Sequence, residues 1–389
     1  MINKIKILVK KNKILKSLYE LLFNRPKINI FSAHHDKKVL FSYSTYHFKN
    51  KNYLGHSNYS ESYIIAKIFD ELGYNVDVVD NDKVCRLDLY SYDIVFGEGL
   101  PLYQAVTLNL DANIIYYATG SHPWQCSSAS LSKLVNYYKS SNYLASESLR
   151  LQDYRWGIAA SLSNSVICIG NEVTKKTFVD NGVDNIYLIN PTFHAEASMS
   201  QINKTHRAMR SVLWFGSYGL LHKGLDTAIE AFRHMPDWTL HVCGKTLEEH
   251  NFINSLDLPP NVVVHGFISI ESDTFKELAS NVGYVLLSSS SEGIATAVLT
   301  AMGRGKMIPL VSKECGIDVH DFGFLLENLE YTSIIKLLNK LNNQSIEELE
   351  LNCVKAQHHA YQNFTIEQYE LTMRSHLLAC ISNYEKSPS

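Results

Sequence analysis

The residues best suited to do chemistry form a loop between a predicted strand and a predicted helix. Residues 212–215 are apolar, residues 216–224 read GSYGLLHKG, and the predicted helix begins at Leu225. Glycines at such a turn let backbone N–H groups approach a phosphate, whose charge the helix N-terminus stabilises. Lys223 would add a cation. The alternative is an ordinary turn, in which the glycines only reverse the chain and Lys223 is solvated.

A second loop offers a carboxylate. Residues 288–293 read SSSSEG and connect a predicted strand over 284–287 to a predicted helix over 295–302. Glu292 therefore stands where a strand ends and a helix begins, and a carboxylate there accepts hydrogen bonds from sugar hydroxyls. The alternative is that Glu292 only interacts with the N-terminus of the following helix, which is worth about 0.3–1 kcal/mol.

Tyrosines and histidines gather in a third loop, after the predicted strand over 39–43. Sugars stack on aromatic rings, so this loop is predicted to bind a carbohydrate. The 23 tyrosines of the chain also allow a simpler role in packing. The predicted binding residues are Tyr46, His47, Gly55 and His56.

Several other functions are disfavoured. The 36 basic and 39 acidic residues give a net charge of -3, whereas a general nucleic-acid binder is usually clearly basic. The 16 histidines form no HExxH motif and the seven cysteines no CxxC pair, so we predict no metal site and reduced, mostly buried thiols. The loop over 44–55 lacks GxGxxG, which disfavours a dehydrogenase. Asp80-Asn81-Asp82 spells DxD but only ends a strand, and we predict a plain loop there.

Short apolar runs alternate with helical stretches from residue 37, and the alternation restarts after a polar stretch over 195–210. Strands separated by helices indicate βαβ units and parallel sheets. The 389 residues also suit two domains. We predict an α/β protein of two Rossmann-like, doubly wound lobes, with ligands at the carboxyl ends of the strands, in a cleft between the lobes. The predicted strands cover residues 39–43, 76–79, 94–96, 114–117, 166–169, 186–189, 212–215, 239–243, 262–264, 284–287 and 307–311, and the predicted helices cover 60–72, 172–180, 225–234, 274–280, 295–302 and 366–382.

The first 30 residues differ from the rest of the chain. They carry eight basic residues and one acidic residue, a net charge of +7, and their leucines recur at helical spacing up to Pro26. Their apolar runs are too short for a membrane span. A basic amphipathic helix suits the surface of an anionic membrane. The alternative is a solvated helix that packs on the domain behind it.

Taken in order, these segments resemble the retaining glycosyltransferases of family 4, which have the two-lobed GT-B fold. The matching text is FGSYGLLHKGLDTAIEAF (215–232), LHVCG (240–244), NVVVHGF (261–267) and VLLSSSSEGIATAVLTAMGRGKMIPLVS (285–312), with weaker matches in SVICIGNEVTKKTF (165–178) and VDNIYLINP (183–191). The resemblance covers residues 37–380 and implies a nucleotide-sugar donor on the second lobe and an acceptor on the first.

The resemblance also gives the predicted parts of the chain their roles. The last segment is expected to be a helix that crosses back to the first lobe. The parts are a basic N-terminal extension (1–36), an acceptor-binding lobe (37–192), a donor-binding lobe (193–365) and a C-terminal helix (366–389).

Three residues match the catalytic positions of the family. The lysine that contacts the donor phosphates matches Lys223, the first of two paired glutamates matches Glu292, and a histidine of the first lobe corresponds to His122. For His122 the alternative is a turn histidine beside Pro123. The full set expected to bind the donor is Gly216, Ser217, Lys223, Glu292, Gly293, Ile294, Ala295, Thr300 and Arg304.

The sequence also departs from the family's pattern. An arginine that contacts the donor diphosphate falls on Ser217, and the second glutamate falls on Thr300. A neutral hydroxyl cannot offset phosphate charge as a bidentate arginine does. Three outcomes stay open: another cation fills the gap, with Arg304 and Lys306 nearest in sequence; the donor carries one phosphate; or the site is inactive.

The predicted function is that of a bacterial glycosyltransferase that builds a cell-surface polysaccharide, such as lipopolysaccharide or capsule, or a glycolipid. The protein would be cytoplasmic, at the inner face of the membrane, and would need no obligatory cofactor or metal. The resemblance implies retention without an enzymic base, with Lys223 and loop N–H groups stabilising the leaving phosphate. The alternative is a non-catalytic scaffold or partner subunit of a glycan assembly complex.

Overall fold

The structure is a computed structural model and describes residues 25–48, 57–196, 199, 201 and 203–386. Most of the predicted N-terminal helix, and the predicted binding residues Gly55 and His56, lie outside these ranges. The chain divides into two compact units. The first unit comprises residues 1–118, 155–167 and 370–389, and the second unit comprises residues 119–154 and 168–369. The domain boundaries and the cleft expected from the sequence stay predictions.

The first sheet has six strands. They are β1 (Lys37–Ser42), β2 (Tyr74–Val79), β3 (Ile94–Gly97), β4 (Asn113–Ala118), β5 (Ser165–Ile169) and β6 (Ile186–Ile189). Their order is β2-β1-β3-β4-β5-β6, and β1 pairs in parallel with both β2 and β3. The order therefore changes direction between β1 and β3. At such a point a doubly wound sheet opens a crevice for ligands at the carboxyl ends of its strands.

Helices follow most of these strands, as the alternation of apolar runs and helical stretches in the sequence predicts. They are η1 (Thr45–Phe48), α3 (Asn58–Glu71), η2 (Leu89–Ser91), α4 (Leu100–Thr107), α5 (Pro123–Ser141), η3 (Ser146–Ser148), α6 (Tyr154–Leu162) and α7 (Glu172–Val179).

The second sheet also has six strands, and every pair of neighbours is parallel. The strands are β7 (Ser211–Phe215), β8 (Thr239–Cys243), β9 (Val262–Gly266), β10 (Tyr284–Leu287), β11 (Ile308–Val311) and β12 (Phe324–Leu325). Their order is β12-β11-β10-β7-β8-β9. This is the Rossmann order, and its change of direction lies between β7 and β10. The predicted α/β class with two Rossmann-like sheets is confirmed.

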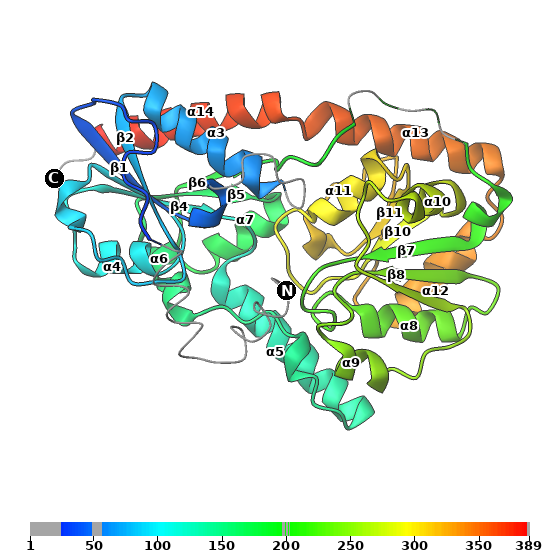
Figure 1. The fold of residues 1–389 in the computed structure, drawn as a ribbon. Helices are drawn as coiled ribbons and strands as arrows, with labels where there is room; N and C mark the ends of the chain where they lie inside the picture. The colour runs from blue at the N-terminus through cyan, green and yellow to red at the C-terminus, as the bar shows by residue number, and fades with distance from the viewer. Residues whose placement is uncertain (1–24, 49–56, 197–198, 200, 202, 387–389) are drawn as a thin grey trace, which may run out of the picture. The chain divides into compact units, whose positions relative to one another are not determined.

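Helices cover both faces of the second sheet, which keeps its apolar strands buried (Figure 1). Contacts join α8 to α12 and α11 to α13. The helical segments are η4 (His206–Arg210), α8 (Leu225–Arg233), α9 (His250–Ser255), α10 (Asp273–Asn281), α11 (Thr296–Gly303), η5 (Lys313–Cys315), α12 (Tyr331–Leu341), α13 (Ile346–Asn363) and α14 (Ile366–Lys386).

The last helix, α14, contributes its residues from 370 onward to the first unit. There Arg374 forms an ion pair with Glu71 of α3, and the Cys380 carbonyl accepts a hydrogen bond from Asn113 of β4, 3.1 Å away. All seven cysteines are free and buried, as predicted. Within the described ranges, no helix has both the length and the apolar character that a bilayer crossing requires.

The buried side chain of Lys204 connects the C-terminal ends of α10 and α11. The Nζ atom of Lys204 donates hydrogen bonds to the carbonyls of Ala279 and Val282, at 2.6 and 2.7 Å, and to that of Gly305, at 3.0 Å. These carbonyls end α10 and follow α11, where helical carbonyls lack partners within the helix. Burial lowers the pKa of Lys204 to about 8, so the ammonium is still charged at pH 7 and provides three donors.

Replacing this ammonium should therefore destabilise the protein. We expect Lys204→Met to lower the free energy of unfolding by roughly 2–4 kcal/mol, because three carbonyls, two of them buried, lose a charged partner. Urea unfolding measures the effect. Lys276→Met is the matched control, because Lys276 is exposed and pairs only with nearby Asp273 on the same helix. Equal stability of the two variants would contradict the prediction.

Candidate active site

The two loops singled out in the sequence lie side by side. Residues 216–224 follow β7 and residues 288–293 follow β10, and these two strands pair in parallel. Both loops therefore leave the same edge of the second sheet, at its change of direction. This is where ligands bind in open parallel sheets. The loops belong to the second unit.

The Glu292 carboxylate is the centre of this site. Its Oε1 atom forms an ion pair with the Nζ atom of Lys223 and accepts a hydrogen bond from Ser289 Oγ at 3.0 Å. Its Oε2 atom accepts a hydrogen bond from Arg150 Nη1 at 3.1 Å. The side chains of Lys223 and Glu292 are 7% and 10% exposed, whereas that of Arg150 is 37% exposed. One nearly buried carboxylate is thus bound by two cations, of which only Arg150 is readily accessible.

The electrostatics favour the charged forms of Glu292 and Arg150. Burial alone would raise the pKa of Glu292, but the charges of Lys223 and Arg150 outweigh it and lower that pKa to about 2. The nearby Glu292 charge in turn raises the pKa of Arg150. Two positive charges and one negative charge leave the cluster with an excess of one positive charge, which suits an anionic ligand.

Glycines fix the position of Glu292. A Cβ atom on Gly293 would lie 2.4 Å from the Ile169 carbonyl oxygen and 3.0 Å from the Cα atom of Gly120. A Cβ atom on Gly316 would lie within bonding distance of the Gly293 carbonyl, and Gly316 has a positive φ of 70°. The backbone beside Glu292 therefore packs directly against other backbone segments, which only glycine permits.

A buried histidine connects the residues on either side of the carboxylate. Because the Ser291 carbonyl can only accept, His222 Nε2 donates to it, at 2.8 Å. His222 Nδ1 then accepts from Ser130 Oγ, at 2.6 Å, and Ser130 Oγ accepts from the Arg150 backbone N–H, at 3.0 Å. Burial lowers the pKa of His222 to about 4, so its ring is neutral at pH 7. This chain of hydrogen bonds positions Arg150 and Glu292 relative to each other.

His122, predicted to be catalytic, lies at the N-terminus of α5. Its ring is fully buried, its Nδ1 atom accepts a hydrogen bond from the Trp124 backbone N–H at 3.3 Å, and it packs edge-on against Phe178. The preceding residue contacts the Glu292 loop, because Ser121 Oγ lies 2.5 Å from Ser291 Oγ. The structure thus brings the segment before α5 against the Glu292 loop, and a catalytic role for His122 stays a prediction.

The backbone N–H groups of the glycine-rich loop, which were expected to bind a phosphate, mostly bond to other groups of the protein. The N–H groups of Gly219 and Leu220 donate to the buried Glu249 carboxylate, at 2.8 and 2.9 Å. The N–H groups of Lys223 and Gly224 donate to carbonyls within the same loop. Most donors expected to hold a phosphate are therefore occupied within the protein, and side-chain cations must supply most of the positive charge.

The other predicted donor-binding residues lie in these loops or directly after them and add no charge. Gly216 donates its N–H to the Cys243 carbonyl, Ser217 is exposed, and Ile294 and Ala295 are buried before α11. Thr300 lies one turn into α11, and its hydroxyl donates to the Thr296 carbonyl at 2.9 Å.

Arg304 is held by carboxylates. Its Nη1 and Nη2 atoms donate to the two carboxylate oxygens of Glu271, at 2.6 and 3.0 Å, and Glu196 lies 3.6 Å away. A ligand phosphate would have to compete with these two acids for the guanidinium. Its predicted contact with the donor stays a prediction.

Two of the predicted carbohydrate-binding residues are described, and both lie in the first unit, on η1 after β1. Tyr46 is exposed, whereas His47 is buried, with its Nδ1 atom 2.9 Å from Ser62 Oγ and its ring 4.2 Å from that of Tyr59. They stand at the change of direction of the first sheet. Their role in binding stays a prediction.

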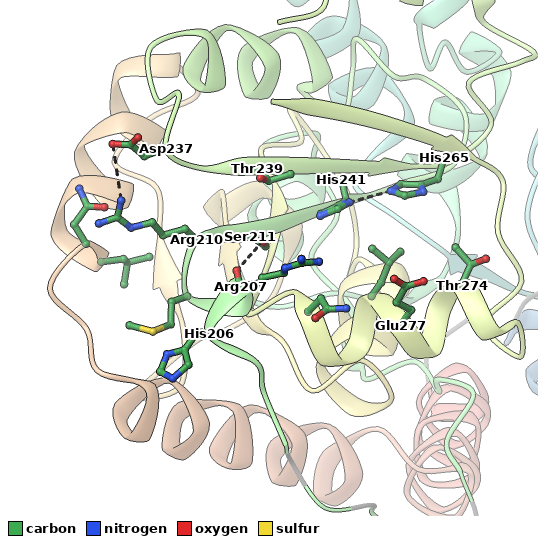
Figure 2. Close-up of a pocket in the computed structure, with 15 residues that line it drawn as sticks. His206, Arg207, Arg210, Ser211, Asp237, Thr239, His241, His265, Thr274 and Glu277 are labelled. Atoms are coloured by element: carbon green, nitrogen blue, oxygen red, sulfur yellow. Dashed lines mark hydrogen bonds and ion pairs between the residues drawn. The ribbon is translucent and has the colours of Figure 1, made fainter. Parts of the chain in front are cut away.

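A separate pocket lies at the opposite, amino ends of β7 and β8 (Figure 2). It has a volume of about 780 Å³ and is lined at the strand starts by Ser211 and Thr239. Figure 2 shows His241 and His265 beside each other in it, with His241 Nδ1 2.9 Å from His265 Nε2. Because the loops of Glu292 and Lys223 leave the other ends of the strands, this pocket is not part of the candidate active site.

No group of three or more histidine, cysteine, aspartate or glutamate side chains is arranged to hold a metal ion in the part of the chain that the structure describes.

The sequence matches a family of known activity over the segment that carries these loops. Residues 205–359 match the family described as glycosyl transferases group 1. This segment is therefore similar to the group 1 glycosyltransferases. Lys223, Glu292 and Thr300 fall within the matched segment, whereas His122 and Arg150 precede it. A comparison with curated proteins finds no match.

Solved structures share the GT-B fold of this chain. HepE of Anabaena, solved with UDP and glucose, matches with a TM-score of 0.54 and 15% identity over 90% of this chain and 100% of its own. A glycosyltransferase from Rickettsia africae matches with a TM-score of 0.54 and 12% identity over 91% of this chain and 100% of its own. The N-terminal domain of trehalose-6-phosphate phosphatase from Candida albicans matches with a TM-score of 0.54 and 10% identity over 90% and 97%.

Arg150, His222 and Glu249 form contacts that the sequence did not predict. Arg150 precedes Glu292 by 142 residues, so no local spacing relates them. Of the three, His222 was the easiest to predict from the sequence, because it directly precedes Lys223, the predicted phosphate-binding lysine.

The ion pairs of Glu292 predict a pH-dependent contribution to stability. The pKa is about 2 in the folded protein and about 4.3 in an unfolded chain. The ionised form therefore stabilises the fold by about 3 kcal/mol above pH 5, and this stabilisation is lost as the pH falls towards 2. We expect Glu292→Gln to be less stable than the wild type by that amount at pH 7, with a difference that narrows below pH 4.

Urea unfolding at a series of pH values measures this difference. Glu230→Gln is the control, because Glu230 pairs with Arg233 at an exposed position. A gap between the wild type and Glu292→Gln that is constant from pH 7 to pH 3 would contradict the expected pKa.

Proposed function

We propose that this glycosyltransferase transfers a sugar, with retention, from a nucleoside-diphosphate sugar to a cell-surface glycan or glycolipid. The observation that carries the proposal is the contact of Glu292 with both Lys223 and Arg150 at the change of direction of the second sheet. It combines a carboxylate that can bind sugar hydroxyls with an excess of positive charge that can bind phosphates. A scaffold that never bound a donor would gain little from two cations on a single carboxylate.

The same cluster supports a donor with two phosphates. A diphosphate spreads its charge over two groups, and two cations match it better than one. The uridine nucleotide is the first to test, because HepE, which shares the fold, was solved with UDP-glucose. Sugars activated by a guanosine diphosphate or by a cytidine monophosphate remain the competing donors.

The low pKa of Glu292 supports a reaction in which this residue is not the base. A general base works best with a pKa near the operating pH, and a carboxyl group with a pKa of about 2 takes up a proton too weakly. Glu292 would instead bind the sugar while the cations stabilise the charge that develops on the leaving phosphate. The acceptor hydroxyl then attacks the anomeric carbon from the side that the leaving group vacates and gives its proton to the departing phosphate, which gives retention.

The first unit would hold the acceptor. Tyr46, exposed on η1, offers a ring on which a sugar can stack. His47 is buried against Tyr59 and would position this segment rather than contact the acceptor.

The donor assignment predicts which nucleotides bind. We expect calorimetry to show binding of UDP or GDP and weaker binding of CMP, and Lys223→Ala to weaken the diphosphate roughly 10- to 150-fold, as expected for one lost charged hydrogen bond. Lys336→Ala is the control, because its ammonium pairs with Glu327 at the surface. Failure of all three nucleotides to bind the wild type would refute the proposed function.

A second experiment tests retention. With the correct donor, NMR measures the anomeric configuration of the product.

The basic N-terminal segment supports a location at the membrane surface. Residues 1–30 have a net charge of +7, and each basic residue near an anionic surface contributes about 1 kcal/mol. We expect deletion of these residues to abolish cosedimentation with liposomes that contain anionic lipid and to leave nucleotide binding unchanged. Neutral liposomes are the control. Undiminished cosedimentation of the truncated protein would contradict the proposal.

A further inference from the structure

We infer that Arg150 binds the sugar-linked phosphate of the donor, in place of the arginine that the resemblance expects at Ser217. The inference rests on the proposed function. Arg150 belongs to neither of the two loops that the sequence singled out, and it lies outside the matched domain of residues 205–359. It reaches the site from the segment between η3 and α6.

The backbone of Arg150 is fixed before any ligand arrives. Its N–H donates to Ser130 Oγ at 3.0 Å, and its carbonyl accepts from Cys126 Sγ at 3.6 Å. Both partners lie on α5, and Ser130 also bonds to His222. The residue that carries the guanidinium is therefore attached to the same hydrogen-bond chain that positions the Glu292 loop.

The side chain of Arg150 lies directly on the glycine-rich loop. A Cβ atom on Gly219 would be 2.5 Å from the Cγ atom and 3.1 Å from the Cδ atom of Arg150. Gly219 also has a positive φ of 79°. Only glycine permits both this backbone conformation and this close contact. The aliphatic part of Arg150 thus crosses the loop in which Ser217 and Lys223 lie, and its guanidinium ends beside Glu292.

The guanidinium is available to a ligand. It donates to Glu292 through Nη1, whereas a guanidinium carries five N–H donors, and 37% of the side chain is exposed. Lys223, by contrast, is 7% exposed and directed at the same carboxylate. A phosphate that enters the site can therefore bind Arg150 without breaking its bond to Glu292.

The remaining positive groups near the loop are engaged elsewhere. The N–H groups of Gly219 and Leu220 are bound to Glu249. Arg304 is bound by Glu271 through both oxygens, and the Lys245 ammonium lies over the Tyr218 ring, 3.8 Å from its centroid. Arg150, by contrast, contacts the Glu292 carboxylate that is proposed to bind the sugar. The phosphate nearest that sugar is the one it would meet.

Comparison of a nucleoside diphosphate with its monophosphate tests this assignment. If Arg150 binds the sugar-linked phosphate, Arg150→Ala should weaken UDP about 10- to 100-fold by calorimetry and weaken UMP less than about 3-fold. Arg150→Lys, which keeps the charge but loses the planar fork, should fall between the wild type and Arg150→Ala. If GDP is the nucleotide that binds, GDP and GMP replace the uridine pair.

Two controls separate this role from a structural one. Near-ultraviolet circular dichroism and urea unfolding show whether Arg150→Ala keeps its fold, and Arg233→Ala removes an arginine that pairs with Glu230 away from the site. Equal losses for UDP and UMP would overturn the inference, because the guanidinium would then act on the site as a whole. A loss that follows Arg304→Ala instead would also overturn it.

The outcomes distinguish this inference from the proposed function. A wild-type protein that binds UDP, with an Arg150→Ala variant that binds it equally well, overturns the inference alone. A wild-type protein that binds no nucleotide overturns both.

Discussion

A nearly buried carboxylate with a cation on each oxygen is the interaction on which this site depends. Removing one charge from water costs several kcal/mol, and the cost is offset only when the partners are held in place. Lys223, Arg150 and Glu292 come from three distant stretches of one chain, and each is fixed by its own backbone contacts. The parallel pairing of β7 and β10 brings two of these stretches together, and the hydrogen bonds of α5 add the third.

On the proposed function, this arrangement would prepare the site before a donor binds. Glu292 holds both cations close together without a ligand, so they need little rearrangement when phosphate charge arrives. The same contacts keep the pKa of Glu292 at about 2, which removes it as a base and leaves it as an acceptor of hydrogen bonds. The carboxylate therefore positions the two cations, and the cations keep the carboxylate ionised.

Sequence patterns predicted the parts of the structure that depend on neighbours along the chain. Buried parallel strands read as apolar runs, so β1 to β11 were all predicted, whereas β12 has two residues and carries no pattern. Helix α5 was missed because its sequence, PWQCSSASLSKLVNYYKSS, is rich in serine and buries few residues. The two loops at the carboxyl ends of β7 and β10 were found by their glycines, Lys223 and Glu292. The partners of Lys223 and Glu292 depend on tertiary contacts, and sequence patterns did not predict them.

The serine at position 217 illustrates why a motif is an incomplete guide to a charged site. Read along the chain, its place in the loop lacks a cation, and Arg304 and Lys306 are the substitutes that the sequence suggests. In the folded protein Arg304 is bound to Glu271, while Arg150, 142 residues before Glu292, crosses the loop over Gly219. Electrostatic stabilisation depends on where a charge lies and not on which residue number carries it. A departure from the motif therefore shows that the charge is no longer supplied locally, and only the three-dimensional contacts show whether it has been supplied from elsewhere.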